Sequence, residues 1–222
     1  MIIGLAGKAG AGKDTAAEFL VSTYGFRQLA LADNLKTLCK FVFQISHAQC
    51  YDQKLKEKKF ANPILLSPKH IEGIVDFATR INGFEIDTVD VHRMYLYVGQ
   101  LTVFKTPREL LQFVGTELLR DIVDIDYHLK VAKNKIDEGT ENTMYVITDA
   151  RFDNERQMIK KWGGITALVD RKTVDREVGL SNHASENSLS AKDNYDFVID
   201  NSGDIDDLAK EVDKLVTNIN NL

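Results

Sequence analysis

Residues 2–15 read IIGLAGKAGAGKDT, and this stretch decides the fold. Its first five residues are almost continuously apolar, which is typical of a strand buried on both faces of a parallel sheet. From Lys13 to Tyr24, apolar residues recur at helical spacing, and Gly25 stands where such a helix would end. The stretch therefore predicts a strand, a glycine-rich loop and a helix in direct succession.

The loop matches the pattern G-x-x-x-x-G-K. Its glycines let successive backbone N–H groups turn toward phosphate oxygens, and the positive end of the following helix adds to the attraction. The position between a strand and a helix argues against a chance match, and Thr15 stands where a dinucleotide-binding loop has Gly or Ala. We expect the loop to bind the triphosphate of ATP, with Lys13 at the β and γ oxygens. The predicted contacts are Gly7, Ala9, Gly10, Ala11, Gly12, Lys13, Asp14 and Thr15.

Three residues are candidates for holding Mg²⁺. Asp14 replaces the usual Ser or Thr, and its carboxylate could hold the ion directly or through water, while the Thr15 hydroxyl is the nearest substitute for the missing ligand. Asp14 could instead only favour the helix N-terminus electrostatically. Asp149 follows an apolar stretch, as does the acid that orients the metal in many P-loop enzymes.

The rest of the chain repeats the alternation of strand and helix. Further strands are expected at 28–32, 144–148, 165–169 and 197–199, with helices between them and a last helix after residue 204. We therefore predict an α/β, three-layer P-loop kinase fold with a five-stranded parallel sheet. Residues 48–106 break the alternation and predict a largely helical insertion within a single domain of 222 residues.

Polar residues follow each predicted strand, at the edge of the sheet where ligands bind. Asn201, Ser202 and Gly203 follow the last strand and are expected at the nucleotide. Asp33 follows the second strand, with Lys36 one helical turn on, and both are candidates for binding substrate. Asp33 could equally be the N-cap of the next helix.

A helix beginning at Pro107 places Arg108, Gln112 and Thr116 on one polar stripe. Arginine suits bidentate binding of an acceptor phosphate, and glutamine suits recognition of a base edge. Gly115 beside the stripe suggests close approach by a ligand, because glycine lowers helix stability. An ordinary surface stripe is the alternative.

The polar segment 171–192 contains Arg171 and Arg176 and predicts a lid that would bring cations over the transferring phosphoryl group. Arg151, two residues after Asp149, is a further candidate cation. A plain surface loop is the alternative for the lid. The lysines between 54 and 59 are more typical of a solvated run than of a binding patch.

The composition indicates which kinds of binding partner the protein has. The net charge of -5 disfavours bulk nucleic-acid binding. Cys39 and Cys50 are too few for a disulfide framework, and no apolar run is long enough to span a bilayer. These features favour a cytoplasmic protein that acts on small molecules without nucleic-acid or membrane partners, and they leave a homodimer open.

The chain resembles the phage deoxynucleoside monophosphate kinases, relatives of the nucleoside monophosphate kinases and dephospho-CoA kinases. The resemblance lies in GKDT at 12–15, LADNLK at 31–36, RELLQFVGTE at 108–117, DARFDNE at 149–155 and DNSG at 200–203. It implies ATP and Mg²⁺ in the loop, a nucleotide acceptor between the 48–106 insertion and the Arg108 helix, a basic lid over both and, for a phage protein, the host cytoplasm. The implied catalytic residues are Lys13, Arg108, Arg151, Arg171 and Arg176. The implied substrate-binding residues are Asp33, Lys36, Arg108, Gln112, Thr116, His128, Asp149 and Arg151.

One departure from the family concerns base stacking. Similar proteins tend to have Trp shortly after the Gly-Thr helix, where this chain has Tyr127 and His128. Two other functions remain open on the sequence: a kinase for dephospho-CoA or another phosphorylated metabolite, and a nucleotide-controlled switch that uses hydrolysis for timing.

Overall fold

The computed structural model describes residues 1–8, 10–150, 152–171 and 194–220. The chain forms two compact units, one made of Met1–Leu31 and Ala132–Leu222, the other of Ala32–Val131. The predicted lid at 171–192 lies outside the described residues except for Arg171. Among the described residues, no helix combines the length and apolar character that crossing a bilayer requires.

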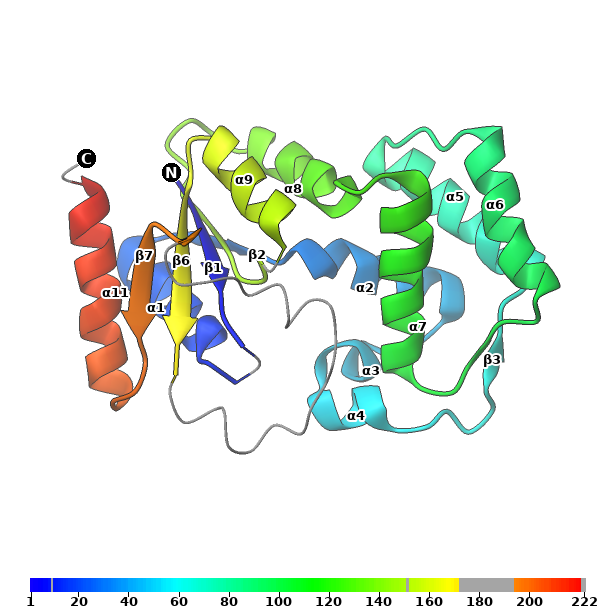
Figure 1. The fold of residues 1–222 in the computed structure, drawn as a ribbon, viewed down its shortest axis with the longest axis horizontal. Coiled ribbons are helices and arrows are strands. Elements are labelled where there is room, and N and C mark those ends of the chain that lie inside the picture. The colour runs from blue at the N-terminus through cyan, green and yellow to red at the C-terminus, as the bar shows by residue number, and fades with distance from the viewer. Residues whose placement is uncertain (9, 151, 172–193, 221–222) are drawn as a thin grey trace. The chain divides into compact units, whose positions relative to one another are not determined.

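The first unit contains a five-stranded sheet in the order β2-β5-β1-β6-β7 (Figure 1). All four neighbouring pairs are parallel, which confirms the predicted fold class. The strands are β1 (Ile2–Ala6), β2 (Arg27–Leu29), β5 (Tyr145–Ile147), β6 (Ile165–Asp170) and β7 (Phe197–Asp200). β1 is the central strand, and the glycine-rich loop follows its carboxyl end. In open parallel sheets, ligands usually bind at the carboxyl ends of the central strands, where the strand order reverses.

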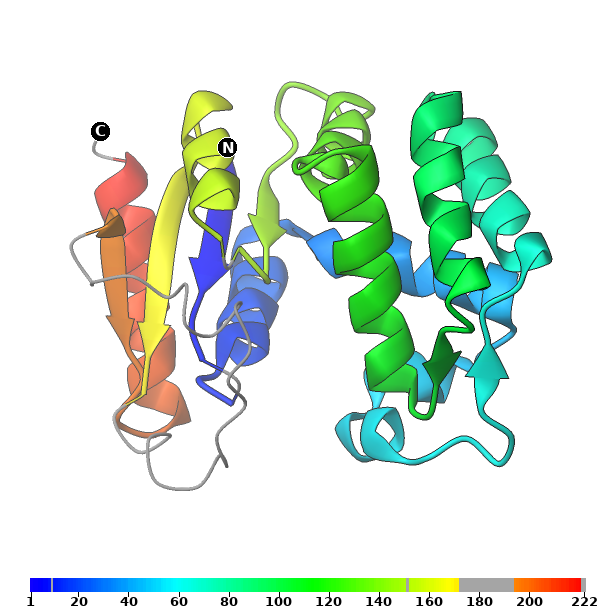
Figure 2. The same ribbon diagram turned by 45° about the vertical axis from the view of Figure 1, so that its right-hand side comes forward.

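Side chains alternate across the central strand and so define two layers of helices. Ile3 and Leu5 belong to a core cluster with buried residues of α1 (Lys13–Tyr24) and α11 (Ile205–Asn220). A Cβ atom on Gly4 would lie 2.6 Å from Cδ1 of Ile159, which belongs to α9 (Asp153–Lys161). Figures 1 and 2 show α9 on the sheet face opposite to α1 and α11. Apolar residues on both faces thus explain why β1 reads as a continuous apolar run.

One carboxylate joins the start of β6 to the chain that enters β7. Asp196 accepts hydrogen bonds from the Thr166 backbone N–H at 2.8 Å and from its hydroxyl at 2.9 Å, and it pairs with Lys160 at 2.9 Å. Burial by itself raises the pKa of Asp196, but the hydrogen bonds from Lys160 and Thr166 outweigh burial and leave the pKa below its ordinary value.

The second unit is mainly helical. Its elements are α2 (Leu31–Phe43), α3 (His47–Tyr51), α4 (Gln53–Glu57), β3 (Ile64–Leu65), α5 (Pro68–Asn82), α6 (Thr88–Gly99), β4 (Val103–Phe104), α7 (Pro107–Phe113), the π-helix η1 (Val114–Val123) and the start of α8 (Tyr127–Asp137). β3 and β4 pair in an antiparallel manner. A buried cluster from all of these helices except α4 forms the core. Cys39 and Cys50 are free thiols, both buried.

One local prediction was wrong, and one confirmed helix has an unpredicted geometry. The second strand ends at Leu29 and α2 begins at Leu31, so Asp33 lies inside the first turn of α2 and is neither the residue after the strand nor the N-cap. The helix that begins at Pro107 changes at Val114 from α to π geometry, in which each N–H donates to the carbonyl five residues earlier. The N–H of Asp124 ends this helix by donating to the carbonyl of Leu119 at 3.0 Å.

Candidate functional site

The glycine-rich loop of the first unit follows β1 and leads into α1. Gly7, Gly10 and Gly12 have φ angles of 148°, 75° and 97°, a region that favours glycine. A Cβ atom on Gly7 would lie 2.6 Å from the backbone oxygen of Val169, so glycine is also required there sterically. These angles give the loop the curl that was expected of a phosphate-binding turn.

Lys13 lies folded over this loop. Its ammonium group donates hydrogen bonds to the backbone oxygens of Gly7 and Lys8, each at 2.8 Å. The residue is half-buried. A triphosphate in the loop would offer the ammonium group charged oxygens, which are stronger acceptors than neutral carbonyls.

Asp14 and Thr15 lie in the first turn of α1, Asp14 exposed and Thr15 half-buried. No cluster of three or more His, Cys, Asp or Glu side chains suited to a metal occurs among the described residues. Mg²⁺ usually takes only one or two carboxylates from the protein and completes its shell with phosphate oxygens and water. The oxygen ligands of this turn therefore fit Mg²⁺ bound together with a triphosphate.

Asp149 follows β5 and is half-buried. Its Oδ1 accepts a hydrogen bond of 2.7 Å from the backbone N–H of Leu31, the first residue of α2. The carboxylate thus stabilises the start of a helix, where N–H groups lack partners within the helix. Arg151, the further candidate cation two residues on, lies outside the described residues.

Asn201 follows β7 and contacts the loop from the side. The residue is 7% exposed, and its Nδ2 donates to the backbone oxygen of Ala11 at 2.8 Å. Ser202 and Gly203 are exposed, as is Arg171 after β6. Of the remaining predicted residues, Ala9 and Arg176 lie outside the described part of the chain.

In the second unit, Asp33 and Lys36 meet an aromatic pair. Asp33 accepts hydrogen bonds from the Lys36 ammonium at 3.0 Å and from the Tyr51 hydroxyl at 3.3 Å. The Lys36 ammonium also lies 4.2 Å from the ring centre of Tyr51, and His47 stacks on Tyr51 with ring centres 4.3 Å apart. Burial, followed by the charge of Asp33, raises the pKa of Tyr51 to about 12, so its hydroxyl remains a donor near neutral pH.

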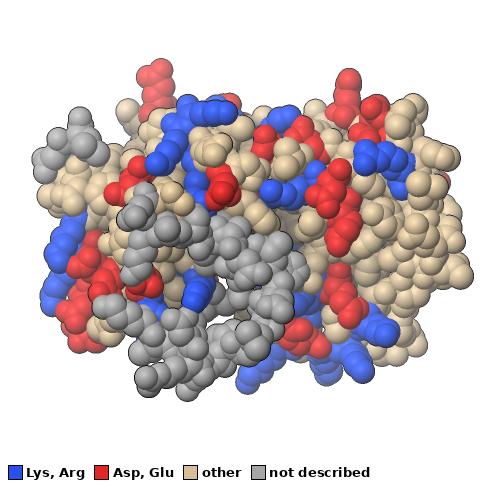
Figure 3. Space-filling model, in the orientation of Figure 1, with Lys and Arg blue, Asp and Glu red and all other residues tan. Residues whose placement is uncertain are grey.

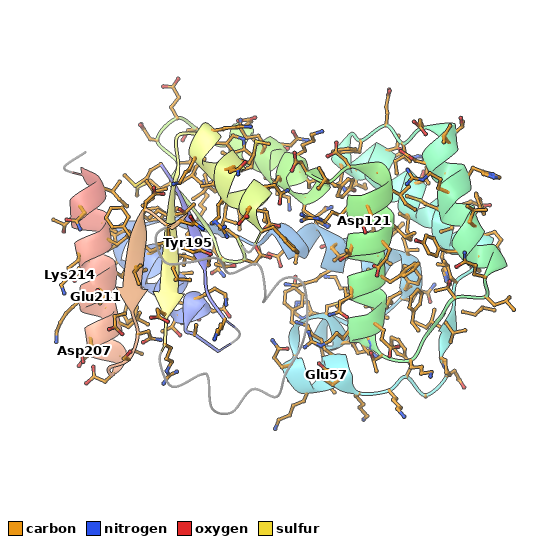
Figure 4. All side chains as sticks on the ribbon, viewed as in Figure 1. Glu57, Asp121, Tyr195, Asp207, Glu211 and Lys214 are labelled. Carbon is orange, nitrogen blue, oxygen red and sulfur yellow. The ribbon has the colours of Figure 1, made fainter. Side chains whose placement is uncertain are left out.

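Arg108 lies at the start of α7 and contacts α4. Its guanidinium pairs with Glu57 and donates to Oε1 of Gln53 at 3.0 Å. Figure 4 labels Glu57 where α4 approaches α7. Figure 3 shows Lys and Arg side chains gathered over α4, where Lys54, Lys58 and Lys59 are exposed as predicted for a solvated run. Arg108 is therefore a cation at the edge of a locally basic surface.

Gln112 and Thr116 are half-buried on the helix that Arg108 begins. The inference drawn from Gly115 was wrong. A Cβ atom on Gly115 would lie 2.6 Å from Cδ2 of Leu35, so the close approach is made by a core leucine of α2 and not by a ligand. Glycine here allows α2 and η1 to pack.

Tyr127 and His128 both make contacts within the second unit. Tyr127 is fully buried, its hydroxyl accepts from Nδ2 of Asn82 at 2.7 Å, and its ring packs on Phe84. His128 Nε2 lies 3.1 Å from the backbone oxygen of Gly115 and acts as the donor, because a carbonyl oxygen only accepts. Tyr127 is thus part of the core and does not offer an open ring face in place of the missing Trp.

Several contacts of this region were not predicted. The contacts of Lys36 with Tyr51 and of Arg108 with Gln53 and Glu57 join residues that are 15 to 55 positions apart in the chain. No pattern in the sequence indicates these pairs. The capping box at Ser46 indicates the start of α3, which carries Tyr51, and the box at Thr106 indicates the start of α7, which carries Arg108. Neither box indicates which helices meet.

Comparisons with known proteins agree with these features. The model of the deoxynucleotide monophosphate kinase family matches residues 96–212, more than half of the chain. A protein of Acanthamoeba polyphaga mimivirus that bears the same family name is 29% identical over 228 residues, covering 98% of this chain and 97% of the relative. The deoxynucleoside-5'-monophosphate kinase of Escherichia phage T5 is 27% identical, with 86% of each chain covered. The deoxynucleotide monophosphate kinase of Escherichia phage RB69 is 23% identical, with 97% of this chain and 99% of the relative covered.

The parallel sheet, the glycine-rich loop and its lysine define a P-loop phosphotransferase. Within that class, the chain belongs to the deoxynucleotide monophosphate kinase family. This membership confirms the resemblance seen in the sequence, and it does not favour the dephospho-CoA alternative.

Proposed function

We propose that the protein transfers the γ-phosphoryl group of ATP to a deoxynucleoside 5'-monophosphate, giving the diphosphate and ADP. The observation that carries this proposal is the curled loop with Lys13 folded over its carbonyls, in a chain of the deoxynucleotide monophosphate kinase family. The proposal extends to this chain the activity that the names of its phage relatives state.

The first unit would hold the phosphoryl donor, ATP. The backbone N–H groups of the loop would surround the β and γ phosphates. As the triphosphate enters, the Lys13 ammonium would exchange its hydrogen bonds to two neutral carbonyls for hydrogen bonds to charged phosphate oxygens. Mg²⁺, held through Asp14 or Thr15 and the phosphates, would neutralise charge that develops during transfer. Asp149, tied to the start of α2, would have a fixed carboxylate direction.

The second unit would bind the acceptor phosphate through Lys36 and Arg108. Lys36 is paired with Asp33, and Arg108 is paired with Glu57. Each ion pair keeps the side chain of the cation in a defined direction. A phosphate carries more charge than a carboxylate and offers more oxygens, so it can compete for the same cations. Gln112, Thr116 and the ring pair of His47 and Tyr51 are the groups we propose to lie near the acceptor nucleoside.

The reaction needs positioning and charge neutralisation more than it needs a strong base. The acceptor is already an anion, and phosphoryl transfer proceeds through a loose transition state in which cations stabilise the transferring group. Arg151, Arg171 and Arg176 remain the predicted additional cations for this step. His128, whose Nε2 donates to the Gly115 carbonyl, stays a predicted substrate-binding residue.

An ADP-release assay with a panel of acceptors tests the proposal. The purified chain with ATP and Mg²⁺ should release ADP when at least one of the common deoxynucleoside monophosphates is present, and the matching diphosphate should form in equal amount. Dephospho-CoA and a reaction without acceptor serve as controls for the other two candidate functions. Turnover with dephospho-CoA alone, or ATP loss that no acceptor accelerates, would contradict the proposal.

A further inference from the structure

Asn201 connects three parts of the first unit. Its backbone N–H donates to the oxygen of Asp170 at the end of β6 at 2.8 Å, and its own position directly follows β7. Its side chain crosses to the glycine-rich loop, where Nδ2 donates to the oxygen of Ala11 at 2.8 Å. The residue is 7% exposed, so this hydrogen bond is protected from water. Asn201 therefore ties the loop to the ends of two strands.

The bonded oxygen belongs to the peptide group that joins Ala11 to Gly12. In a trans peptide the C=O and N–H groups point in opposite directions. With the carbonyl held by Asn201, the N–H of Gly12 must point away from Asn201. In a phosphate-binding loop, backbone N–H groups of this kind supply the contacts to the anion.

Gly12 restrains this peptide only weakly on one side. Rotating the peptide would change ψ of Ala11 and φ of Gly12, and glycine tolerates most φ values. The space beside Gly12 is also taken by Asn201, since a Cβ atom on Gly12 would lie 2.3 Å from Nδ2. Gly12 thus permits both the unusual φ of 97° and the close approach of the amide.

We propose that Asn201 is a positioning residue that sets the Ala11–Gly12 peptide so that the Gly12 N–H faces the triphosphate. The proposal rests on one part of the proposed function, namely that the ligand of the loop is a triphosphate. It differs from the expectation drawn from the sequence, in which Asn201 contacts the nucleotide itself. The side-chain amide is instead directed at the loop, and its effect on ATP passes through Ala11 and Gly12.

Calorimetric titration of the full chain with ATP and with inorganic tripolyphosphate separates these roles. For Asn201→Ala, affinity for both ligands should fall by a similar factor, roughly tenfold for one lost hydrogen bond to a buried carbonyl. Asn201→Asp keeps the volume but replaces the donor with an acceptor, so its loss should be at least as large. Asn218→Ala, an exposed asparagine on α11, is the matched control and should bind both ligands normally.

Two readouts exclude a merely structural effect. The melting temperature without ligand reports on folding, and the amide NMR resonance of Gly12 should already shift in Asn201→Ala before ligand is added. Loss of ATP affinity with unchanged tripolyphosphate affinity would overturn the proposal in favour of direct contact with the nucleoside. Unchanged affinity for both would overturn it as well. A wild-type chain that binds tripolyphosphate but phosphorylates no deoxynucleoside monophosphate would refute the proposed function and leave this inference standing.

Discussion

Replacement of Arg108 by alanine should weaken binding of the acceptor and leave the stability of the fold nearly unchanged. The guanidinium pairs with Glu57 through side chains that are 39% and 60% exposed, and such exposed pairs contribute about 0 to 1 kcal/mol. The free energy of unfolding should therefore change by no more than about 1 kcal/mol. A charge-assisted hydrogen bond to a phosphate contributes roughly 1.5–3 kcal/mol, which corresponds to about a 10- to 150-fold loss.

The assay is steady-state kinetics with each substrate varied in turn. For Arg108→Ala, kcat/KM for the deoxynucleoside monophosphate should fall by that factor, while ATP affinity measured without acceptor stays close to wild type. Arg108→Lys should lie between the two, because lysine keeps the charge but loses bidentate geometry. Arg93→Ala removes another exposed ion pair of the second unit, with Asp90, and is the matched control.

Three results would refute this reasoning. Equal damage to ATP and acceptor would place Arg108 at the donor or at a structural position. Unchanged kinetics would make the guanidinium an ordinary surface group, which was the alternative that the sequence left open. A fall in stability well above 1 kcal/mol would show that its contacts with α4 are stronger than their exposure indicates.

Three further outcomes are expected. Lys13→Ala should lower kcat by at least about 100-fold, as removal of a group that stabilises transition-state charge does, with an unchanged circular dichroism spectrum. Gly7→Ala should lower stability by roughly 1–3 kcal/mol in urea unfolding and weaken ATP binding, because its Cβ would meet the Val169 oxygen at 2.6 Å and its φ is 148°. Asp196→Asn should be less stable than wild type at pH 7, and this difference should vanish at low pH. The folded pKa of Asp196 is lowered, so its contribution is present above the unfolded value of about 3.9 and is lost as pH falls through the folded value. A difference that persists at pH 2 would contradict that account.

The elements that local sequence determines could be predicted. The strand, loop and helix at residues 2–24 follow from apolar patterning and glycine positions within one short stretch, and the parallel sheet follows from repetition of that unit. The start of the helix at Pro107 follows from its capping box. In each case the deciding residues are neighbours in the chain.

Features that depend on packing could not be predicted. Gly115 was taken to face a ligand because its neighbour in space, Leu35, is 80 residues away in the chain. The change to π geometry at Val114 has no marker in residue type, and the link from Asn201 to Ala11 spans 190 residues. Asp149 occupies the position expected of a metal-orienting acid, yet its bond to Leu31 adds a capping role that strand patterns do not reveal.

A crystal structure with a non-hydrolysable ATP analogue and a deoxynucleoside monophosphate would test the account most directly. We expect the triphosphate oxygens to lie about 2.7–3.2 Å from the backbone nitrogens of the loop and from the Lys13 ammonium, which will have left the Gly7 and Lys8 carbonyls. A triphosphate bound elsewhere, with Lys13 still on those two carbonyls, would contradict the assignment of the loop as the donor site.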